Sequence, residues 1–179
     1  HIHYCPLWEH APITSVLKQY GTGHDAAAAV VMSGELADCF KNKMDGISFI
    51  VDAVKNAFPA ARFYGTDGKF HDHAVPMLAA ANWLASADYL RKTYPGAVLL
   101  DIGSTTADII PLARFESLKG LTDLMRLQKG YLRYTGMLRG NIATLLQSVL
   151  LDHVDTPVSS EYFAASADAH LVLGHISPA

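Results

Sequence analysis

The sequence predicts an α/β fold with a mixed sheet and flanking helices. Apolar runs of strand length alternate with stretches that have the period of a helix. Two turns rich in glycine and small polar residues, at 65–68 and 103–106, each lie between two strand-like runs. Because such turns join antiparallel neighbours, they indicate a mixed rather than a purely parallel sheet.

Composition limits what the protein can be. The 179 residues are 50% hydrophobic and 17% charged, with a formal net charge of −3, which suits one sizeable core or two small lobes. We find no basic stripe for nucleic acid, and no apolar run near the ~20 residues that a membrane span needs. Cys5 and Cys39 form no disulfide framework and no CxxC site, so we expect a reduced, cytoplasmic setting.

The first half of the chain is expected to alternate helices and strands. Residues 6–20 read as an approach segment and a short helix, and residues 28–33 as a buried strand that turns at Ser33 and Gly34 into another helix. The next helix has one apolar face and ends before Pro59; that face comprises Ile47, Ile50, Val51, Val54 and Phe58.

A hairpin is expected next, with a strand at 62–64 returning at 69–70 across an Asp-Gly turn. The alanine- and leucine-rich residues 75–91 predict one continuous helix. In the second half, 97–102 is the clearest strand and 107–112 its partner. Residues 114–124 are expected to be a loop, 131–134 a short strand, 141–151 a helix capped by Asn141, and 161–173 a helical tail. We place a domain boundary near residue 96, giving lobes at 1–96 and 97–179.

The turn after the clearest strand carries the strongest chemical pattern, Asp101-Ile102-Gly103-Ser104-Thr105-Thr106. Gly103 lets backbone N–H groups approach an anion, and Ser104, Thr105 and Thr106 add hydroxyl donors. Asp101, at the strand end, could hold Mg²⁺, which prefers carboxylate and water oxygens. The same residues are also good hairpin turn formers, so a purely structural role stays open.

The register of this hairpin predicts a second metal ligand. If the turn is centred between Ser104 and Thr105, Asp101 lies opposite Asp108 on the same face. Two carboxylates there repel unless a cation lies between them, which favours a metal site at Asp101 and Asp108.

Other polar residues are weaker candidates. Glu35 and Asp38 would share a face of the helix expected after Ser33, although acidic residues also simply favour a helix N-terminus. Asn82 could bind a ligand or satisfy a backbone group, and Arg133 and Arg139 could clamp a phosphate or lie on the surface.

Five blocks of the sequence resemble a known family. They are Cys5-Pro6-Leu7-Trp8, residues 32–40 (Met-Ser-Gly-Glu-Leu-Ala-Asp-Cys-Phe), residues 79–86 (Ala-Ala-Ala-Asn-Trp-Leu-Ala-Ser), residues 101–111 and Tyr134-Thr135-Gly136. In this order they resemble the tetrahydromethanopterin-linked C1-transfer pathway proteins. Those proteins lie in the hydantoinase A/oxoprolinase branch of the ASKHA (actin- and hexokinase-like) superfamily.

The resemblance implies a transferase of methanofuran biosynthesis in an ASKHA fold. It would condense a phosphorylated aminomethylfuran with a tyramine derivative and release pyrophosphate. Asp101 with Mg²⁺, and the donors of residues 103–106, would stabilise the leaving pyrophosphate. Glu35 is the candidate base for the phenol, and Asn82 and Arg139 are candidate substrate-binding residues.

Departures from the family pattern keep other functions open. The upstream Asp-x-Gly-Gly phosphate loop of the family is absent from this sequence, and the family continues beyond Gly174. We therefore expect a fragment or a chain with internal segments missing. The alternatives are an ATP-dependent ASKHA kinase, a hydantoinase/oxoprolinase-like hydrolase, or a ligand-binding relative without catalysis.

Overall fold

The computed structural model describes residues 2–3, 5–7, 13–20, 27–161 and 164–177. The chain forms two compact units: residues 1–97 with 112–121, and residues 98–111 with 122–179. The first is called unit 1 and the second unit 2. The predicted lobes, 1–96 and 97–179, stay a prediction. Residues 8–12 and 162–163 lie outside the described residues. They include Trp8 of the first family block and parts of the segments predicted at 6–20 and 161–173.

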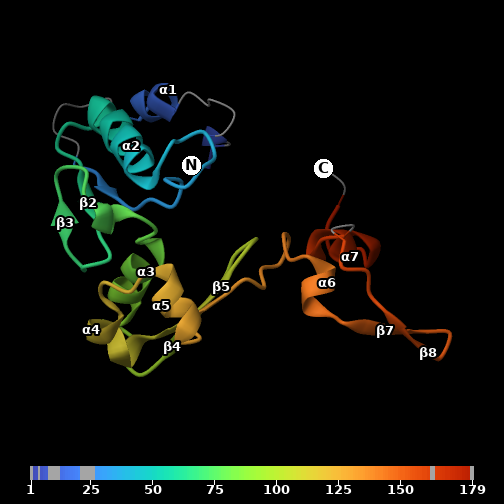
Figure 1. The fold of residues 1–179 in the computed structure, drawn as a ribbon. Helices are drawn as coiled ribbons and strands as arrows, with labels where there is room; N and C mark the ends of the chain where they lie inside the picture. The colour runs from blue at the N-terminus through green and yellow to red at the C-terminus, as the bar shows by residue number, and fades with distance from the viewer. Residues whose placement is uncertain (1, 4, 8–12, 21–26, 162–163, 178–179) are drawn as a thin grey trace. The chain divides into compact units, whose positions relative to one another are not determined.

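Unit 1 is built around helix α2 (Lys43–Ala57) and a small mixed sheet (Figure 1). The sheet has the order β1-β2-β3, with β1 (Ala29–Val30) parallel to β2 (Arg62–Tyr64) and β3 (Phe70–His71) antiparallel to β2. The mixed sheet and the hairpin predicted around residues 65–68 are therefore confirmed. The short helix α1 (Ile13–Lys18), also predicted, packs against α2.

Helix α2 (Lys43–Ala57) supplies most of the core of unit 1. The side chain of Asn42 caps its first turn by accepting from the amide of Asp45 at 3.0 Å. The predicted apolar face is buried against Phe63 and Leu78, both fully inaccessible to solvent. The helical period of residues 47–58 therefore gave the correct element and the correct face.

The helix predicted over residues 75–91 is interrupted. A 3₁₀ turn, η2 (Pro76–Leu78), precedes α3 (Asn82–Leu90), and Ala80 between them has a φ of +46°. That left-handed backbone cannot continue a right-handed helix, so alanine content alone misled the prediction.

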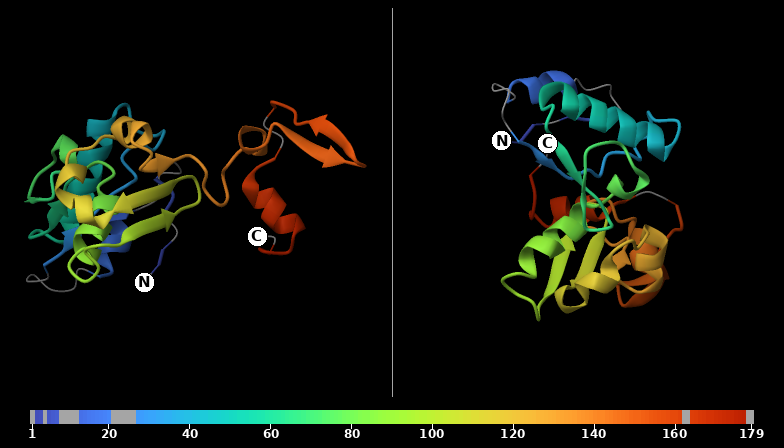
Figure 2. Two further views of the ribbon diagram at one scale, coloured as in Figure 1. Left: turned by 90° about the horizontal axis from the view of Figure 1, so that it is seen from below. Right: turned by 90° about the vertical axis from the view of Figure 1, so that its left-hand side faces the viewer.

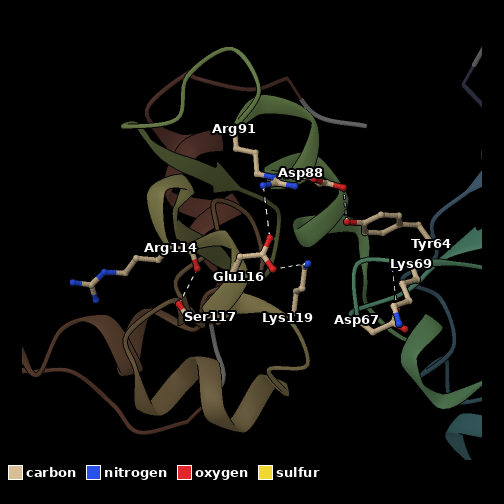
Figure 3. A network of polar contacts seen from close by, with 9 residues as sticks. All are labelled: Tyr64, Asp67, Lys69, Asp88, Arg91, Arg114, Glu116, Ser117 and Lys119. Atoms are coloured by element: carbon tan, nitrogen blue, oxygen red, sulfur yellow. Dashed lines mark hydrogen bonds and ion pairs between the residues drawn. The ribbon is translucent and has the colours of Figure 1, made fainter.

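Residues 112–121 pack in unit 1 although they follow strands of unit 2. They form η3 (Leu112–Arg114) and α4 (Phe115–Leu118), not the predicted loop. Figure 3 shows Glu116 between Arg91 of α3 and Lys119, while the side chain of Arg114 points away from them. Arg91 also stacks over the ring of Phe115 at 3.9 Å from its centroid. Tertiary packing of this kind stabilises a helix too short to stand alone.

Unit 2 holds a sheet of order β4-β5-β6 and a separate hairpin (Figure 2). Strands β4 (Val98–Ile102), β5 (Ala107–Pro111) and β6 (Leu132–Arg133) confirm the three predicted strands. Helix α5 (Asp123–Gln128), capped by Thr122, lies within and beyond the predicted loop. Helix α7 (Ser166–Val172) confirms part of the predicted tail.

The helix predicted over residues 141–151 is correct only in its first turn. Asn141 caps α6 (Ile142–Leu145), as expected, by accepting from Ala143. Residues Ser148–Leu151 instead form β7, paired with β8 (Val154–Pro157). Asp152 and His153 both have positive φ, +48° and +65°, which gives the two-residue turn that a hairpin prefers. Among the described residues, no helix is both long and apolar enough to cross a bilayer.

Candidate functional site: an anion-binding turn in unit 2

The turn between β4 and β5 has the predicted register. Asp101 pairs with Asp108, and Ile102 with Ala107, in an antiparallel ladder closed by a hydrogen bond from the Gly103 amide to the Thr106 carbonyl at 2.9 Å. Residues directly opposite one another in such a ladder share a face. The prediction that the two aspartates lie side by side is therefore confirmed.

A segment far along the chain binds the carbonyl groups of this turn. Residues 136–139, called the strap below, donate four amide hydrogen bonds to it. The Gly136 amide bonds the Thr105 carbonyl and the Met137 amide the Gly103 carbonyl, both at 3.0 Å. The Ser104 carbonyl accepts from Leu138 at 3.0 Å and from Arg139 at 2.8 Å. The negative ends of the peptide dipoles in this turn are therefore all satisfied by protein.

The amide groups of the same turn are left available. Within the described part of the chain, the N–H groups of Ser104, Thr105 and Thr106 have no hydrogen-bond acceptor, and neither do their hydroxyl groups. Ser104 is exposed, and Thr105 and Thr106 are half-buried. Consecutive free amides in a turn are a candidate site for an anion. The turn is therefore polarised: its carbonyls face the strap and its donors remain free for a ligand.

Gly136 is required for this arrangement. A Cβ atom at that position would lie 2.3–2.5 Å from backbone atoms of Thr105 and Ser104. Any other residue would push the strap away from the turn and lengthen the hydrogen bonds to it. The sequence contained Gly136 in a family block, but its contact with a turn some thirty residues earlier could not be deduced from spacing.

The two aspartates differ in their surroundings. Asp101 is exposed, and its carboxylate has no hydrogen-bond or ion-pair partner among the residues described. Asp108 accepts a hydrogen bond from Arg126, whose side chain is 4% exposed and also bonds Asp123 at 3.0 Å. Burial lowers the pKa of Arg126 to about 10, an effect that Tyr134 partly offsets. The repulsion from which a shared metal was inferred is therefore relieved at Asp108 by a side-chain cation.

Arg126 is a residue that the sequence analysis missed. It lies on α5, beyond the predicted loop at 114–124 and in a stretch for which no element was predicted, and contacts β5 only because α5 packs beside β6. Its i, i+3 spacing from Asp123 was visible in the sequence. Nothing in that spacing connects it with Asp108.

Glu35 is buried, but not on a helix. The predicted helix after Ser33 is wrong: residues 33–41 form turns, one of them closed by a bond from the Ala37 amide to the Gly34 carbonyl. Glu35 is 1% exposed, and its Oε2 atom has no hydrogen-bond partner among the described residues. The backbone of Gly46, in the first turn of α2, packs so closely that a Cβ there would lie 2.2 Å from the Glu35 carbonyl oxygen.

The remaining candidates are solvent-accessible. Asn82 is exposed at the start of α3 in unit 1, and Arg139 is exposed on the strap, with its backbone bound to Ser104. No group of three or more His, Cys, Asp or Glu side chains suited to a metal ion occurs in the described residues. His71 instead pairs with Asp67, at 3.2 Å.

Comparisons with known proteins give a consistent family. The family model described as hydantoinase/oxoprolinase matches residues 26–179. Two relatives, from Methanocaldococcus jannaschii and Methanococcus vannielii, are both called (4-{4-[2-(gamma-L-glutamylamino)ethyl]phenoxymethyl}furan-2-yl)methanamine synthase.

The two relatives differ in how much of this chain they cover. The first is 36% identical over 182 residues, covering 97% of this chain and 55% of the relative. The second is 42% identical over 80 residues, covering 45% of this chain and 36% of the relative. The chain spans about half the length of the first relative and about a third of the second. The family match extends over most of the sequence and includes both the Glu35 turn and the candidate anion-binding turn, and the chain belongs to the hydantoinase/oxoprolinase family.

Proposed function

We propose that this chain is part of a transferase that joins a diphosphate-activated aminomethylfuran to a tyramine derivative through an aryl ether, in methanofuran-type cofactor synthesis. The observation that carries the proposal is the set of three free amides at Ser104, Thr105 and Thr106. The relatives' name supports the product class, because it describes a phenoxymethyl-furan with a glutamylaminoethyl group.

The proposed reaction exchanges one carbon–oxygen bond for another. The phenol oxygen attacks the furan methylene carbon, the bond from that carbon to the diphosphate oxygen breaks, and pyrophosphate leaves with the bonding electron pair. Negative charge grows on the leaving group as this bond breaks. Preorganised hydrogen-bond donors directed at the diphosphate oxygen of the breaking bond stabilise the transition state more than they stabilise the bound substrate. This difference is what accelerates the step.

Mg²⁺ would be held by Asp101 in this proposal. Mg²⁺ binds through one or two carboxylates together with substrate phosphates, and Asp101 is an exposed carboxylate one residue from the strand end, beside three hydroxyl-bearing residues. When bound, the ion would neutralise charge on the diphosphate. Asp108 is the weaker ligand candidate, since Arg126 already compensates its charge.

Glu35 is proposed as the acceptor for the phenol proton. Support comes from its burial and from an oxygen without a partner among the described residues, because a carboxylate in such surroundings is available to a substrate O–H. Asn82 and Arg139 are proposed substrate contacts, as exposed polar groups without another ion-pair role in the described residues. The ASKHA fold and a cytoplasmic setting are part of the same proposal; Cys5 and Cys39, both free thiols, agree with the latter.

The test measures pyrophosphate release from the activated furan with tyramine or γ-glutamyltyramine, with and without Mg²⁺. Asp101→Asn is expected to abolish the Mg²⁺-dependent release. Asp155→Asn, at another exposed strand aspartate of unit 2, is the matched control and should leave it unchanged. Ether product formed equally well by the Asp101→Asn variant would refute the proposed role of the turn.

A second candidate is favoured by the family match: an ATP-dependent hydantoinase/oxoprolinase-like hydrolase or kinase. It would use the same turn for a nucleotide phosphate. ATP consumption in the absence of any phenol acceptor would establish this reading instead of the first. Binding of phosphate compounds without turnover of either kind would identify a ligand-binding relative.

A further inference from the structure

Ser166 is a buried polar residue in the second layer behind the anion-binding turn. It begins α7 and is 9% exposed. Its hydroxyl donates to the Gly136 carbonyl and accepts from the Gly140 amide, both at 3.2 Å. One hydroxyl therefore bridges the first residue of the strap and the residue directly after it.

The backbone of α7 adds two bonds to the same segment. The Ser166 amide donates to the Gly140 carbonyl at 2.8 Å, and the Ala167 amide to the Leu138 carbonyl at 3.1 Å. The first amides of a helix have no acceptor within the helix, and here Gly140 and the strap residue Leu138 each supply an acceptor for one of them. The start of α7 and residues 136–140 are thus held together by four hydrogen bonds, two of them to Gly140.

The strap consequently has two bonded sides. Its amides donate to the carbonyls of Gly103, Ser104 and Thr105, while its own carbonyls at Gly136 and Leu138 accept from α7. A loss of contact on the α7 side frees the strap to move away from the turn. The turn carbonyls would then lose the partners that keep the amides of residues 104–106 pointing the other way.

We propose that Ser166 is a positioning residue for the anion-binding turn, acting through the strap bonds between Gly136 and Gly140. It touches no substrate. The choice of a diphosphate as the ligand rests on the proposed function. The effect of Ser166 on the strap can be measured in the absence of any ligand. A neutral hydrogen bond of this kind, lost from a buried site, changes a local equilibrium by about three- to tenfold.

The experiment compares Ser166→Ala with Ser159→Ala, a control at an exposed serine of unit 2. Amide hydrogen exchange of Met137, Leu138 and Arg139 is measured without ligand, and the affinity for inorganic pyrophosphate with Mg²⁺ by calorimetry. We expect exchange to speed up, and the pyrophosphate Kd to rise, by about three- to tenfold in Ser166→Ala only. Ser166→Thr, which keeps the hydroxyl, should recover both values.

The possible failures are distinguishable. Unchanged exchange and unchanged Kd in Ser166→Ala would overturn the inference and leave the proposed function intact. Absence of pyrophosphate binding by the unsubstituted chain would overturn both together. If Ser166→Ala fails to fold, Ser166→Cys keeps the volume with a weaker donor and should give intermediate exchange rates and Kd; values equal to those of the unsubstituted chain would again overturn the inference.

Discussion

The guanidinium of Arg126, on α5, donates a hydrogen bond to the carboxylate of Asp108, on β5, directly opposite Asp101. The cation beside this pair of aspartates is therefore a side chain of the protein. Both partners are largely buried, with side-chain exposures of 4% and 13%. Removing Arg126 would therefore leave the Asp108 carboxylate without its ion-pair partner, and removing Asp108 would leave the buried guanidinium with Asp123 alone. Asp108 and Asp101 are adjacent in the sheet, but of the two only the Asp108 carboxylate has an ion-pair partner among the described residues.

Asp108→Asn should destabilise unit 2 by about 3–5 kcal/mol, the cost of breaking a buried ion pair from one side. Asp101→Asn, at an exposed carboxylate, should change the free energy of unfolding by less than about 0.5 kcal/mol. Urea unfolding of both variants measures the difference. An Asp108→Asn variant that kept its stability but lost all response to Mg²⁺ would instead make Asp108 a metal ligand.

Gly136→Ala should loosen the anion-binding turn. The new methyl group would overlap backbone atoms of Ser104 and Thr105, and overpacking of that kind costs about 1–3 kcal/mol. Gly96→Ala is the control, since a Cβ at Gly96 meets no atom within 4 Å. Chemical shifts of the Ser104–Thr106 amides report on the turn: they should move in Gly136→Ala, and identical spectra would show that the close approach does not shape the site.

The position and register of the hairpin turn at residues 103–106 could be predicted from sequence because their determinants are local. Four turn-forming residues between two apolar runs fix where the chain reverses. The antiparallel register on either side of that turn then fixes which residues lie opposite one another. The pairing of Asp101 with Asp108 follows from their equal distance from the centre of the turn. The buried face of α2 was equally predictable, because Ile47, Ile50 and Val54 repeat at the helical period.

The support for the turn could not be predicted, because it depends on contacts between distant segments. The strap contributes four backbone amides, which carry no sequence pattern, and Arg126 reaches Asp108 from a six-residue helix. Local periodicity also failed where another partner was available. Residues 148–151 have helical spacing, yet pair with β8 once the chain reverses at Asp152 and His153.

The acid stability of unit 1 should depend on Asp88. Burial alone would raise the pKa of this carboxyl, but hydrogen bonds from Arg91 (2.7 Å) and Tyr64 (2.9 Å) outweigh it and hold the pKa below its usual value. The stabilisation is therefore fully present above the unfolded pKa of about 3.9, and is lost as the pH falls through the lower folded value.

Asp88→Asn should cost about 1–3 kcal/mol at pH 7, and this difference should shrink as the pH falls below about 3.9. Asp52→Asn, at an exposed position of α2, is the control and should behave like the unsubstituted chain. Unfolding by urea at pH 7, 5, 4 and 3 gives the required profile. A constant difference across that range would mean that Asp88 contributes through packing rather than charge.

Glu35 should prove costly to stability and necessary for activity. A buried polar group without a hydrogen-bond partner costs about 1–3 kcal/mol in proteins, and the Oε2 atom of Glu35 is such a group among the described residues. Glu35→Met, which keeps the length of the side chain and removes its polar atoms, should therefore raise the free energy of unfolding by about that amount.

Replacing Glu35 should also reduce the activity, because Glu35 is the proposed base. In Glu35→Gln and Glu35→Met, the rate of ether formation should fall by roughly 10²-fold or more. Asp38→Asn, at the exposed acidic residue of the next turn, should change neither quantity. A Glu35→Met variant that loses stability would show instead that the carboxylate holds the turn against Gly46, and full activity in Glu35→Gln would remove Glu35 from the chemistry.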